Sequence, residues 1–391
     1  MIQLDILRGI AILLVLFTHA VIQPDEAGSW RPVLSYLRYL GPSGVDLFFV
    51  LSGFLVGGLL LKEFHDKGQL DVRRFLIRRG FKIWPPYFVF LAAVFLWLTL
   101  IEHQSGGHSL RRLLPNLLHL QNYLGSPREH TWSLAVEEHF YVALPLLLLA
   151  LTGSRARKTG SIALLPAVAV TVGLMCATAR FFAYGRAHSY NLHYATHLRL
   201  DSLLFGVLLA YFYHFRPERL SFAREHRWKM LGLAVGLLLL YPAFLISDHD
   251  KRYVGSIGFA IMYVAYGAIL LVLVHTPVDL GWIGWLLGGP IGRLFAFVGY
   301  FSYPIYLWHL DARWPIARLL RSHPMTGPWP EMRWLIAFLV YLLIALAAGV
   351  FFGILVDRQS LALRERFFPA RTRVPTEQGQ PDANDHPRSK I

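Results

Sequence analysis

The sequence predicts an all-α polytopic membrane protein of about ten transmembrane helices, with both termini in the cytoplasm. Of the 391 residues, 55% are hydrophobic and only 16% are charged, too few charges to cover a soluble protein of this size. Apolar windows long enough to cross a bilayer follow one another along most of the chain. Basic residues gather in alternate connections between these windows, the pattern that orients membrane proteins.

The apolar windows define the expected spans. They cover 5–23, 44–62, 84–102, 134–152, 162–184, 197–215, 229–247, 254–275, 297–316 and 334–356. We predict one transmembrane domain over residues 1–360. A polar tail over 361–391 should follow it, because PTEQGQPDANDHPRSK has the composition of a disordered segment.

Lysine and arginine are unevenly distributed between the connections. Residues 62–82, 155–158 and 216–229 are rich in them, and they fall on one side of the predicted membrane. The positive-inside rule makes that side cytoplasmic, together with both termini. The net charge of +14 is thus spread over connections near anionic lipid. This distribution argues against a nucleic-acid partner.

Polar side chains interrupt several windows, where burial is costly and points to function. Arg8 and His19 lie within about 20° of one helical face and about 16 Å apart along the axis. They would therefore face the same region from opposite sides of the bilayer. The other candidates are Asp46, Ser52, Trp132, Ser133, Glu137, Arg199, Asp201 and His309, with the basic residues Arg78, Arg79 and Lys82.

Each candidate also has a purely structural interpretation. Arg8 could extend to the lipid interface, and Glu137 would be favoured by the dipole of a first helical turn. Arg199 and Asp201 could pair with other helices, and His309 could form a hydrogen bond between helices. No set of histidines and cysteines has metal-binding spacing, so we predict no metal and no permanently bound cofactor.

Gly53 and Gly57 have the spacing of a small-xxx-small motif. In a membrane helix this motif is typical of close helix packing. We therefore interpret these two glycines as a packing surface and not as part of a reactive site.

Six segments of the chain resemble, in order, the sequence blocks of acyltransferase family 3, a family of integral-membrane O-acyltransferases with an Arg-x10-His motif. The segments are RGIAILLVLFTH (8–19), GVDLFFVLSGFL (44–55), RRGFKIWPPY (78–87), TWSLAVEEHFY (131–141), RLDSLLFGVLLA (199–210) and GYFSYPIYLWH (299–309). His139 departs from the family pattern, in which we expect a glutamine. It would add a titratable group to the site.

The resemblance implies about ten transmembrane helices in the inner (cytoplasmic) membrane of a bacterium. It also implies transfer of an acyl group, usually acetyl, from acyl-coenzyme A, with acetyl-CoA as a donor substrate. The acceptor would be a hydroxyl of a cell-envelope carbohydrate or of a glycosylated small molecule. Many relatives carry a C-terminal SGNH hydrolase-like domain. Because this chain ends before such a domain, we expect it to deliver the acyl group itself.

The residues and the resemblance lead to one hypothetical mechanism. The coenzyme phosphates would be bound from the cytoplasmic side by Arg8, Arg78, Arg79 and Lys82. His19 would act as a general base or be acylated transiently. Either Glu137 or Asp46 would orient its imidazole, and the remaining candidates would support the site or the substrate.

Charged groups inside a membrane also fit proton-coupled transport. The alternative function is therefore a transporter or flippase of a sugar-containing substrate. The sequence does not choose the acceptor, the acyl length or the oligomeric state.

Overall fold

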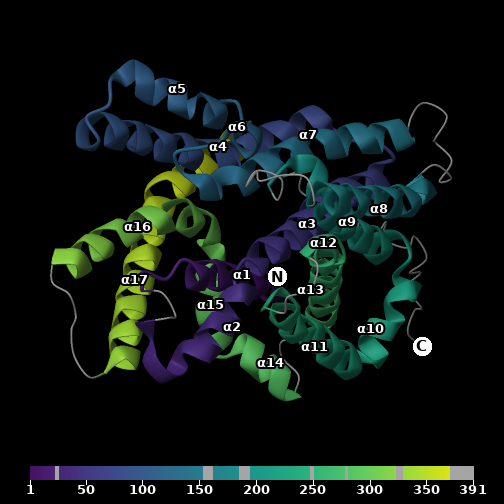
Figure 1. The fold of residues 1–391 in the computed structure, drawn as a ribbon. Coiled ribbons are helices and arrows are strands. Elements are labelled where there is room, and N and C mark those ends of the chain that lie inside the picture. The colour runs from purple at the N-terminus through teal and green to yellow at the C-terminus, as the bar shows by residue number, and fades with distance from the viewer. Residues whose placement is uncertain are drawn as a thin grey trace, which may run out of the picture.

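The computed structural model describes residues 1–22, 26–152, 162–184, 194–246, 251–277, 281–322 and 329–369. Within these ranges the regular elements are all helical (Figure 1), which confirms an all-α protein. The α-helices are α1 (Ile2–Thr18), α2 (Arg31–Leu40), α3 (Ser43–Lys67), α4 (Val72–Leu96), α5 (Gly106–Leu117), α6 (Gln121–Leu124), α7 (Trp132–Thr152), α8 (Leu165–Tyr184), α9 (Leu200–Phe215), α10 (Ser221–Glu225), α11 (Arg227–Ile246), α12 (Lys251–Tyr253), α13 (Phe259–Val274), α14 (Gly281–Gly288), α15 (Pro290–Tyr300), α16 (Ser302–Ser322), α17 (Pro330–Phe352) and α18 (Arg358–Phe367).

Short helical turns adjoin several of these helices. The π-helical turns are η3 (Trp97–Ile101), η9 (Val254–Gly258) and η10 (Gly353–Asp357). The 3-10 turns are η2 (Gly28–Trp30), η4 (Glu129–Thr131), η5 (Ile162–Leu164), η7 (Thr196–Leu198) and η8 (Pro217–Leu220).

Six helical stretches of the described chain are long and apolar enough to cross a membrane. They are Gly28–Lys67, Val72–Ile101, Glu129–Thr152, Ile162–Ala183, Gly255–Val274 and Pro330–Phe367. Each of the ten predicted windows overlaps a helix. The chain is thus an all-α membrane protein, whereas ten spans and cytoplasmic termini stay predictions. The basic connection 155–158 and the tail from residue 370 lie outside the described residues.

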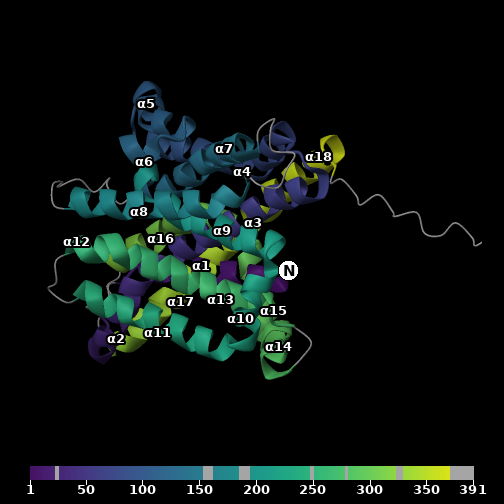
Figure 2. The same ribbon diagram turned by 90° about the vertical axis from the view of Figure 1, so that its right-hand side faces the viewer.

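The helices surround a centre formed by α1, α3 and α9 (Figure 1). Helix α3 packs along α9, and α1 packs along α15. The pair α16 and α17 lies on one flank of the bundle, and the pair α11 and α13 lies on the other (Figure 1). Helix α18 lies beside the first turns of α4 (Figure 2). A helix from the C-terminal part of the chain, α18, therefore lies against the basic start of α4.

Helix α4 begins at Val72, well before the window expected from residue 84. Its cap is Asp71, whose carboxylate accepts a hydrogen bond from the backbone N–H of Arg74 at 3.1 Å. The basic run up to Lys82 is therefore helical and not a connection. The helix continues past Pro85 and Pro86, as membrane helices tolerate when neighbouring elements satisfy the backbone.

Two other predicted boundaries also differ from the structure. The window 297–316 contains the end of α15 and the start of α16, because the chain turns at Phe301. Helix α18 extends to Phe367, so the first residues assigned to the polar tail are helical. Its Glu365 pairs with Arg78 of α4 at 2.9 Å, a contact between distant segments that composition does not encode.

Gly53 of α3 and Gly206 of α9 allow a close helix contact at the centre of the bundle. A Cβ on Gly206 would lie 2.3 Å from the carbonyl oxygen of Val50 and 2.7 Å from the backbone nitrogen of Phe54. A Cβ on Gly53 would lie 1.9 Å from the carbonyl oxygen of Leu203. Because the obstructing atoms are backbone, they cannot move aside cheaply. The interpretation of the glycine motif as a packing surface is confirmed at Gly53.

We predict that Gly206→Ala lowers the stability of the folded protein by about 1–3 kcal/mol, the cost of overpacking a well-packed interface. Thermal unfolding in detergent measures the effect. Gly236→Ala is the matched control, because a Cβ at that helical position meets nothing within 4 Å. Equal melting temperatures for the two variants would contradict the close contact between α3 and α9.

Candidate active site

A cavity of about 380 Å³ lies inside the bundle, between α1, α3, α4, α7 and α16. We call it the central cavity. Its cationic lining consists of Arg8, Arg79 and Lys82. Along α16 its lining extends to Tyr306. This volume lies in the range of ligand pockets. The carboxylates of Asp5, Glu137 and Asp357 also line the cavity, and its three cationic side chains are groups that can bind an anion through charge-assisted hydrogen bonds.

Arg8 faces the central cavity from the first turns of α1. Its Nη1 lies 2.9 Å from Oδ1 of Asp5, and both side chains are partly exposed, at 28% and 31%. This pair is accessible and leaves other N–H groups of the guanidinium able to bind a ligand. Arg8 therefore belongs to a cavity wall within the protein, not only to the lipid interface.

Glu137 reaches the same cavity from α7 through a chain of hydrogen bonds. The hydroxyl of Tyr141 donates to Oε2 of Glu137 at 2.6 Å. Because the Tyr141 hydroxyl donates its hydrogen to Glu137, the Ser52 hydroxyl is the donor in its 2.7 Å contact with the Tyr141 oxygen. The guanidinium of Arg79 lies 5.5 Å from the Tyr141 ring. The chain fixes Ser52, Tyr141 and Glu137 on the wall next to Arg79.

A second cavity, of about 360 Å³, adjoins the first at the start of α4. We call it the basic cavity. Arg79 and Lys82 line both cavities, whereas Arg74, Arg78 and Arg364 line only the basic one. The four residues predicted to bind the coenzyme phosphates therefore do not all line one cavity. Arg78 forms a 2.9 Å ion pair with Glu365 of α18, and Arg8 lies in the central cavity alone.

Three histidines meet behind Tyr306, and we call them the histidine cluster. The ring centroids of His19 and His309 are 5.0 Å apart, and those of His309 and His130 are 4.9 Å apart. Tyr306 lies 5.5 Å from both His130 and His309. Its hydroxyl donates to the His130 carbonyl at 2.5 Å and accepts from Ser133 at 2.7 Å. Tyr306 and Ser133 therefore separate the central cavity from the histidine cluster.

Backbone contacts determine which ring nitrogens can accept a proton. Nδ1 of His19 contacts the Val15 carbonyl at 2.8 Å, and Nδ1 of His309 contacts the Tyr306 carbonyl at 2.7 Å. A carbonyl can only accept, so each Nδ1 carries a hydrogen and each neutral ring keeps a lone pair on Nε2. His130 has the opposite arrangement, because its Nε2 contacts the Leu307 carbonyl at 3.2 Å. Each ring thus offers one basic nitrogen.

The predicted orientation of His19 by a carboxylate differs from the structure. The Val15 carbonyl takes that role. Glu137 is bonded to Tyr141, and Asp46 is bonded to Arg199. His19 also lies one residue beyond the end of α1, with φ −98° and ψ 19°.

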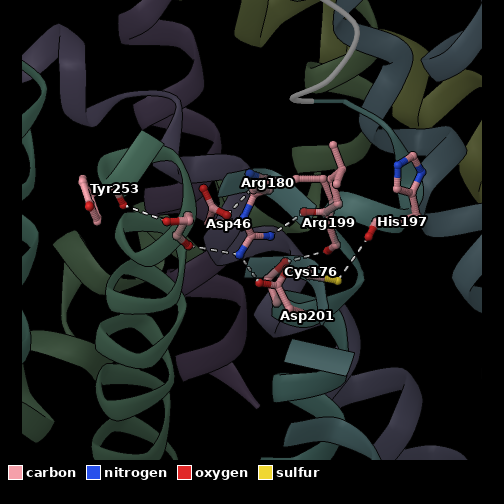
Figure 3. A network of polar contacts seen from close by, with 10 residues as sticks. Asp46, Cys176, Arg180, His197, Arg199, Asp201 and Tyr253 are labelled. Carbon is pink, nitrogen blue, oxygen red and sulfur yellow. Dashed lines mark hydrogen bonds and ion pairs between the residues drawn. The ribbon is translucent and has the colours of Figure 1, made fainter. Parts of the chain in front are cut away.

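Asp46, Arg199 and Asp201 belong to a buried ionic network (Figure 3). Arg199 Nη2 lies 2.7 Å from Asp46 Oδ1, and Arg180 Nη2 lies 2.6 Å from Asp201 Oδ2. These four side chains are at most 6% exposed. Arg199 also lies over the Phe259 ring at 4.0 Å. The network joins α3, α8, α9 and α13, and its residues act as structural support.

Two further residues singled out in the sequence are Trp132, which lies beside this ionic network, and His139, which lies outside it. Trp132 packs against Phe49 with centroids 5.9 Å apart and lies 5.6 Å from the Arg199 guanidinium. His139 contacts the Thr196 hydroxyl through Nδ1 at 2.6 Å and is not part of the central cavity lining. The expectation that His139 adds a titratable group to the site is therefore not met.

Sequence reasoning missed His130, Tyr306 and Arg180. Arg180 lies inside the predicted window 162–184, and a charged residue within an apolar span could have marked it as a candidate. His130 precedes the window that starts at residue 134, in the turn η4. Only the packing of that turn against α16 brings it to His309.

The family model described as "Acyltransferase domain" (Acyl_transf_3) matches residues 1–356. The chain belongs to this acyltransferase family. Family membership, together with six candidate spans in the described residues, makes it a membrane protein of an acyltransferase family. No solved structure matches it at a significant level.

Two of the similar curated proteins are from Staphylococcus aureus. A protein of strain COL named "Putative O-acetyltransferase" is 29% identical over 324 residues, which are 78% of this chain and 49% of the relative. "O-acetyltransferase OatA" of strain NCTC 8325 is 27% identical over 354 residues, which are 86% of this chain and 55% of the relative. This chain thus spans about half the length of the curated relatives it matches.

We predict that Asp46 is needed for stability through its ion pair. Asp46→Asn leaves the Arg199 charge buried without its partner, which costs about 3–5 kcal/mol. The double variant Asp46→Asn/Arg199→Met should lose less than the sum of both single losses. Thermal unfolding of the four proteins gives the coupling energy. Strictly additive losses would contradict the pairing.

Proposed function

We propose that this membrane acyltransferase transfers an acyl group, typically acetyl, from acyl-CoA to a carbohydrate hydroxyl in the bacterial cytoplasmic membrane. One observation carries the proposal. The basic cavity and the central cavity share Arg79 and Lys82, and the central cavity ends at Tyr306, beside His309 and His130. This arrangement suits a long anionic donor with a reactive end.

Arg79 and Lys82 favour an anion at the junction of the cavities. Within the described ranges neither makes an ion pair, in contrast to Arg8 and Arg78. Lys82 also lies close enough to Arg8, Arg79 and Arg364 for their positive charges to act on it, and Asp357 opposes them as the one carboxylate in the same set. Phosphate groups would relieve this repulsion through charge-assisted hydrogen bonds. We place the coenzyme phosphates here and the acyl thioester deeper, toward Tyr306.

His19 is the proposed general base. Its Nε2 would take the proton of the acceptor hydroxyl while the oxygen attacks the thioester carbonyl. The carbon–oxygen bond forms, the carbon–sulfur bond breaks, and the proton passes to the coenzyme thiolate. In this scheme Tyr306 and Ser133 yield to admit the acyl group, since they lie between the central cavity and the histidine cluster. Direct transfer needs no acylated histidine.

The proposed orientation follows from the basic residues. The start of α4 and the basic cavity would face the cytoplasm, where acyl-CoA is available, as the positive-inside rule predicts. Helix α4 then leads outward, so the histidine cluster lies deeper in the bilayer than the phosphates. An acceptor would approach His19 from the outer side.

We predict that His19→Ala lowers acetyl transfer by about 10²–10⁴-fold, the usual contribution of a general base, and leaves CoA binding intact. The measurement is labelled acetyl transfer from acetyl-CoA by purified protein reconstituted in vesicles. His275→Ala is the matched control, because His275 also caps a helix and also bonds the carbonyl four residues earlier through Nδ1 at 2.8 Å. Near-normal turnover of His19→Ala would refute the catalytic role, and transport without acetyl transfer would favour the transporter alternative.

We predict that the basic cavity recognises the 3′-phosphate of the coenzyme. Arg74→Ala should then weaken CoA binding about tenfold or more, as expected for a lost hydrogen bond to a charged group. Its effect on 3′-dephospho-CoA should be small. Lys62→Ala is the control, because Lys62 is exposed and paired with Asp66. Equal losses for both ligands would place the 3′-phosphate elsewhere.

A further inference from the structure

A third cavity, of about 440 Å³, lies near the carboxyl end of α4 and the middle of α16. We call it the tryptophan pocket. Trp97, Trp308 and Trp314 line it, together with the charged residues Glu102, Arg128, Asp311 and Arg313. The proposed donor site uses none of these residues.

The tryptophan pocket and the central cavity lie in sequence along two helices. On α4, Lys82 lines the central cavity and Trp97 directly follows the helix, about 22 Å further along the axis. On α16, Tyr306 lines the central cavity and Asp311 lines the pocket about 7.5 Å further on. His309 lies between them on α16. The two cavities therefore approach the histidine cluster from opposite directions.

The aromatic part of the pocket has a fixed shape. Trp97 and Trp314 meet at 84° with centroids 4.7 Å apart, so their rings form a corner. The indole N–H of Trp97 donates to Oε1 of Glu102 at 3.2 Å, which holds that ring in place. The faces of such rings carry partial negative charge and attract the C–H groups of a ligand.

The polar part of the pocket has an incompletely bonded carboxylate. Nε and Nη2 of Arg128 both contact Oδ1 of Asp311, at 2.8 and 2.6 Å. Oδ2 of Asp311 is buried and has no hydrogen-bond partner among the described residues. A buried acceptor without a donor is costly and calls for a ligand or water. A hydroxyl group supplies the missing donor.

From these observations we propose that the tryptophan pocket binds a sugar ring of the hydroxyl-bearing acceptor. A pyranose has C–H groups that pack on aromatic rings and hydroxyls that bond Asp311 and Arg128. Trp97 and Trp314 differ here from an interfacial aromatic belt, because they border a concave site with four charged residues. That the bound sugar is the acceptor of the acyl group rests on the proposed function, whereas sugar binding itself does not.

The position of Arg313 connects this pocket with the catalytic histidine. Arg313 lines the pocket, and its charge lies close enough to act on both His19 and His309. A sugar held by Asp311 would thus lie within one or two helical turns of the histidine cluster. A neighbouring hydroxyl of the same ligand could then approach Nε2 of His19.

The test measures sugar binding to the full detergent-purified chain, without acyl donor, by saturation-transfer NMR. The probes are N,N′-diacetylchitobiose and maltose, with glycerol as the non-ring control. We expect at least one disaccharide to bind, with transfer strongest at its ring C–H protons. Trp314→Ala and Asp311→Asn should each weaken binding about tenfold or more, the effect of losing one contact to a charged or aromatic group. Asp311→Asn is informative because Arg128 retains the amide oxygen, so an N–H group replaces Oδ2.

Matched variants separate a binding site from a folding effect. Trp314→Phe keeps an aromatic ring and should retain most of the binding, and Trp285→Ala should bind as the wild type, because Trp285 is 71% exposed on α14. Thermal unfolding checks that each variant folds. No disaccharide binding by the wild type, or binding as tight as the wild type's by both Trp314→Ala and Asp311→Asn, would overturn the proposal.

The variant His19→Ala distinguishes this inference from the proposed function. It should bind the disaccharide unchanged, because no chemistry is involved. If sugars bind but acetyl transfer is absent from the wild type, the proposed function fails and the pocket stands. If acetyl transfer occurs but the pocket variants bind sugar normally, the pocket assignment fails and the function stands.

Discussion

The structure depends on the cost of a charge inside an apolar bundle, which forces each buried charge to find an opposite charge or a ligand. Asp46 and Arg199, and Arg180 and Asp201, satisfy this constraint within the protein at 2.7 and 2.6 Å. Their pairing joins α3, α8 and α9 near the place where Gly206 allows close contact. Helix α3, which lines the central cavity, is therefore held to α8 and α9 by electrostatics and by small side chains together.

The same constraint bears on the cavity wall. Arg79 and Lys82 face the junction of two cavities and form no ion pair within the described ranges; the carboxylates that act on them, Glu137 on Arg79 and Asp357 on Lys82, also line the central cavity, so both cations keep N–H groups that a ligand can use. Arg78, only one residue from Arg79, is neutralised by Glu365 at 2.9 Å. Adjacent helical positions point about 100° apart, and this difference separates a residue that anchors α18 from one available to a ligand.

The sequence was sufficient to predict the class of fold and some residues of the cavity wall. Runs of apolar residues predicted the helices, charges within them marked Arg8 and Glu137 as candidates, and the basic run before the window 84–102 marked Arg79 and Lys82. All four line the central cavity. These predictions succeeded because hydropathy and local charge are properties of short segments, which a sequence displays directly.

The parts that sequence did not reveal depend on contacts between distant segments. Asp46 pairs with a residue 153 positions away, so its role as support and not as a partner of His19 could not be read locally. His130 is brought to Leu307, 177 positions away, by a single turn. The start of α4 was also missed, because hydropathy ignores a polar first turn that Asp71 caps.

A two-sided arrangement follows from the direction of α4 and α16. Both helices lead from the central cavity past the histidine cluster to the tryptophan pocket. The histidines, which can move a proton, therefore lie between the proposed site of the anionic donor and the proposed site of the sugar. Tyr306 and Ser133 close one side of that cluster through hydrogen bonds of 2.5 and 2.7 Å. A barrier at this point would keep water and protons from passing between the two cavities. Transfer would then require only that the acyl group, and not the whole coenzyme, pass Tyr306. A small acyl group such as acetyl meets that requirement most easily, so the barrier itself favours a short-chain donor.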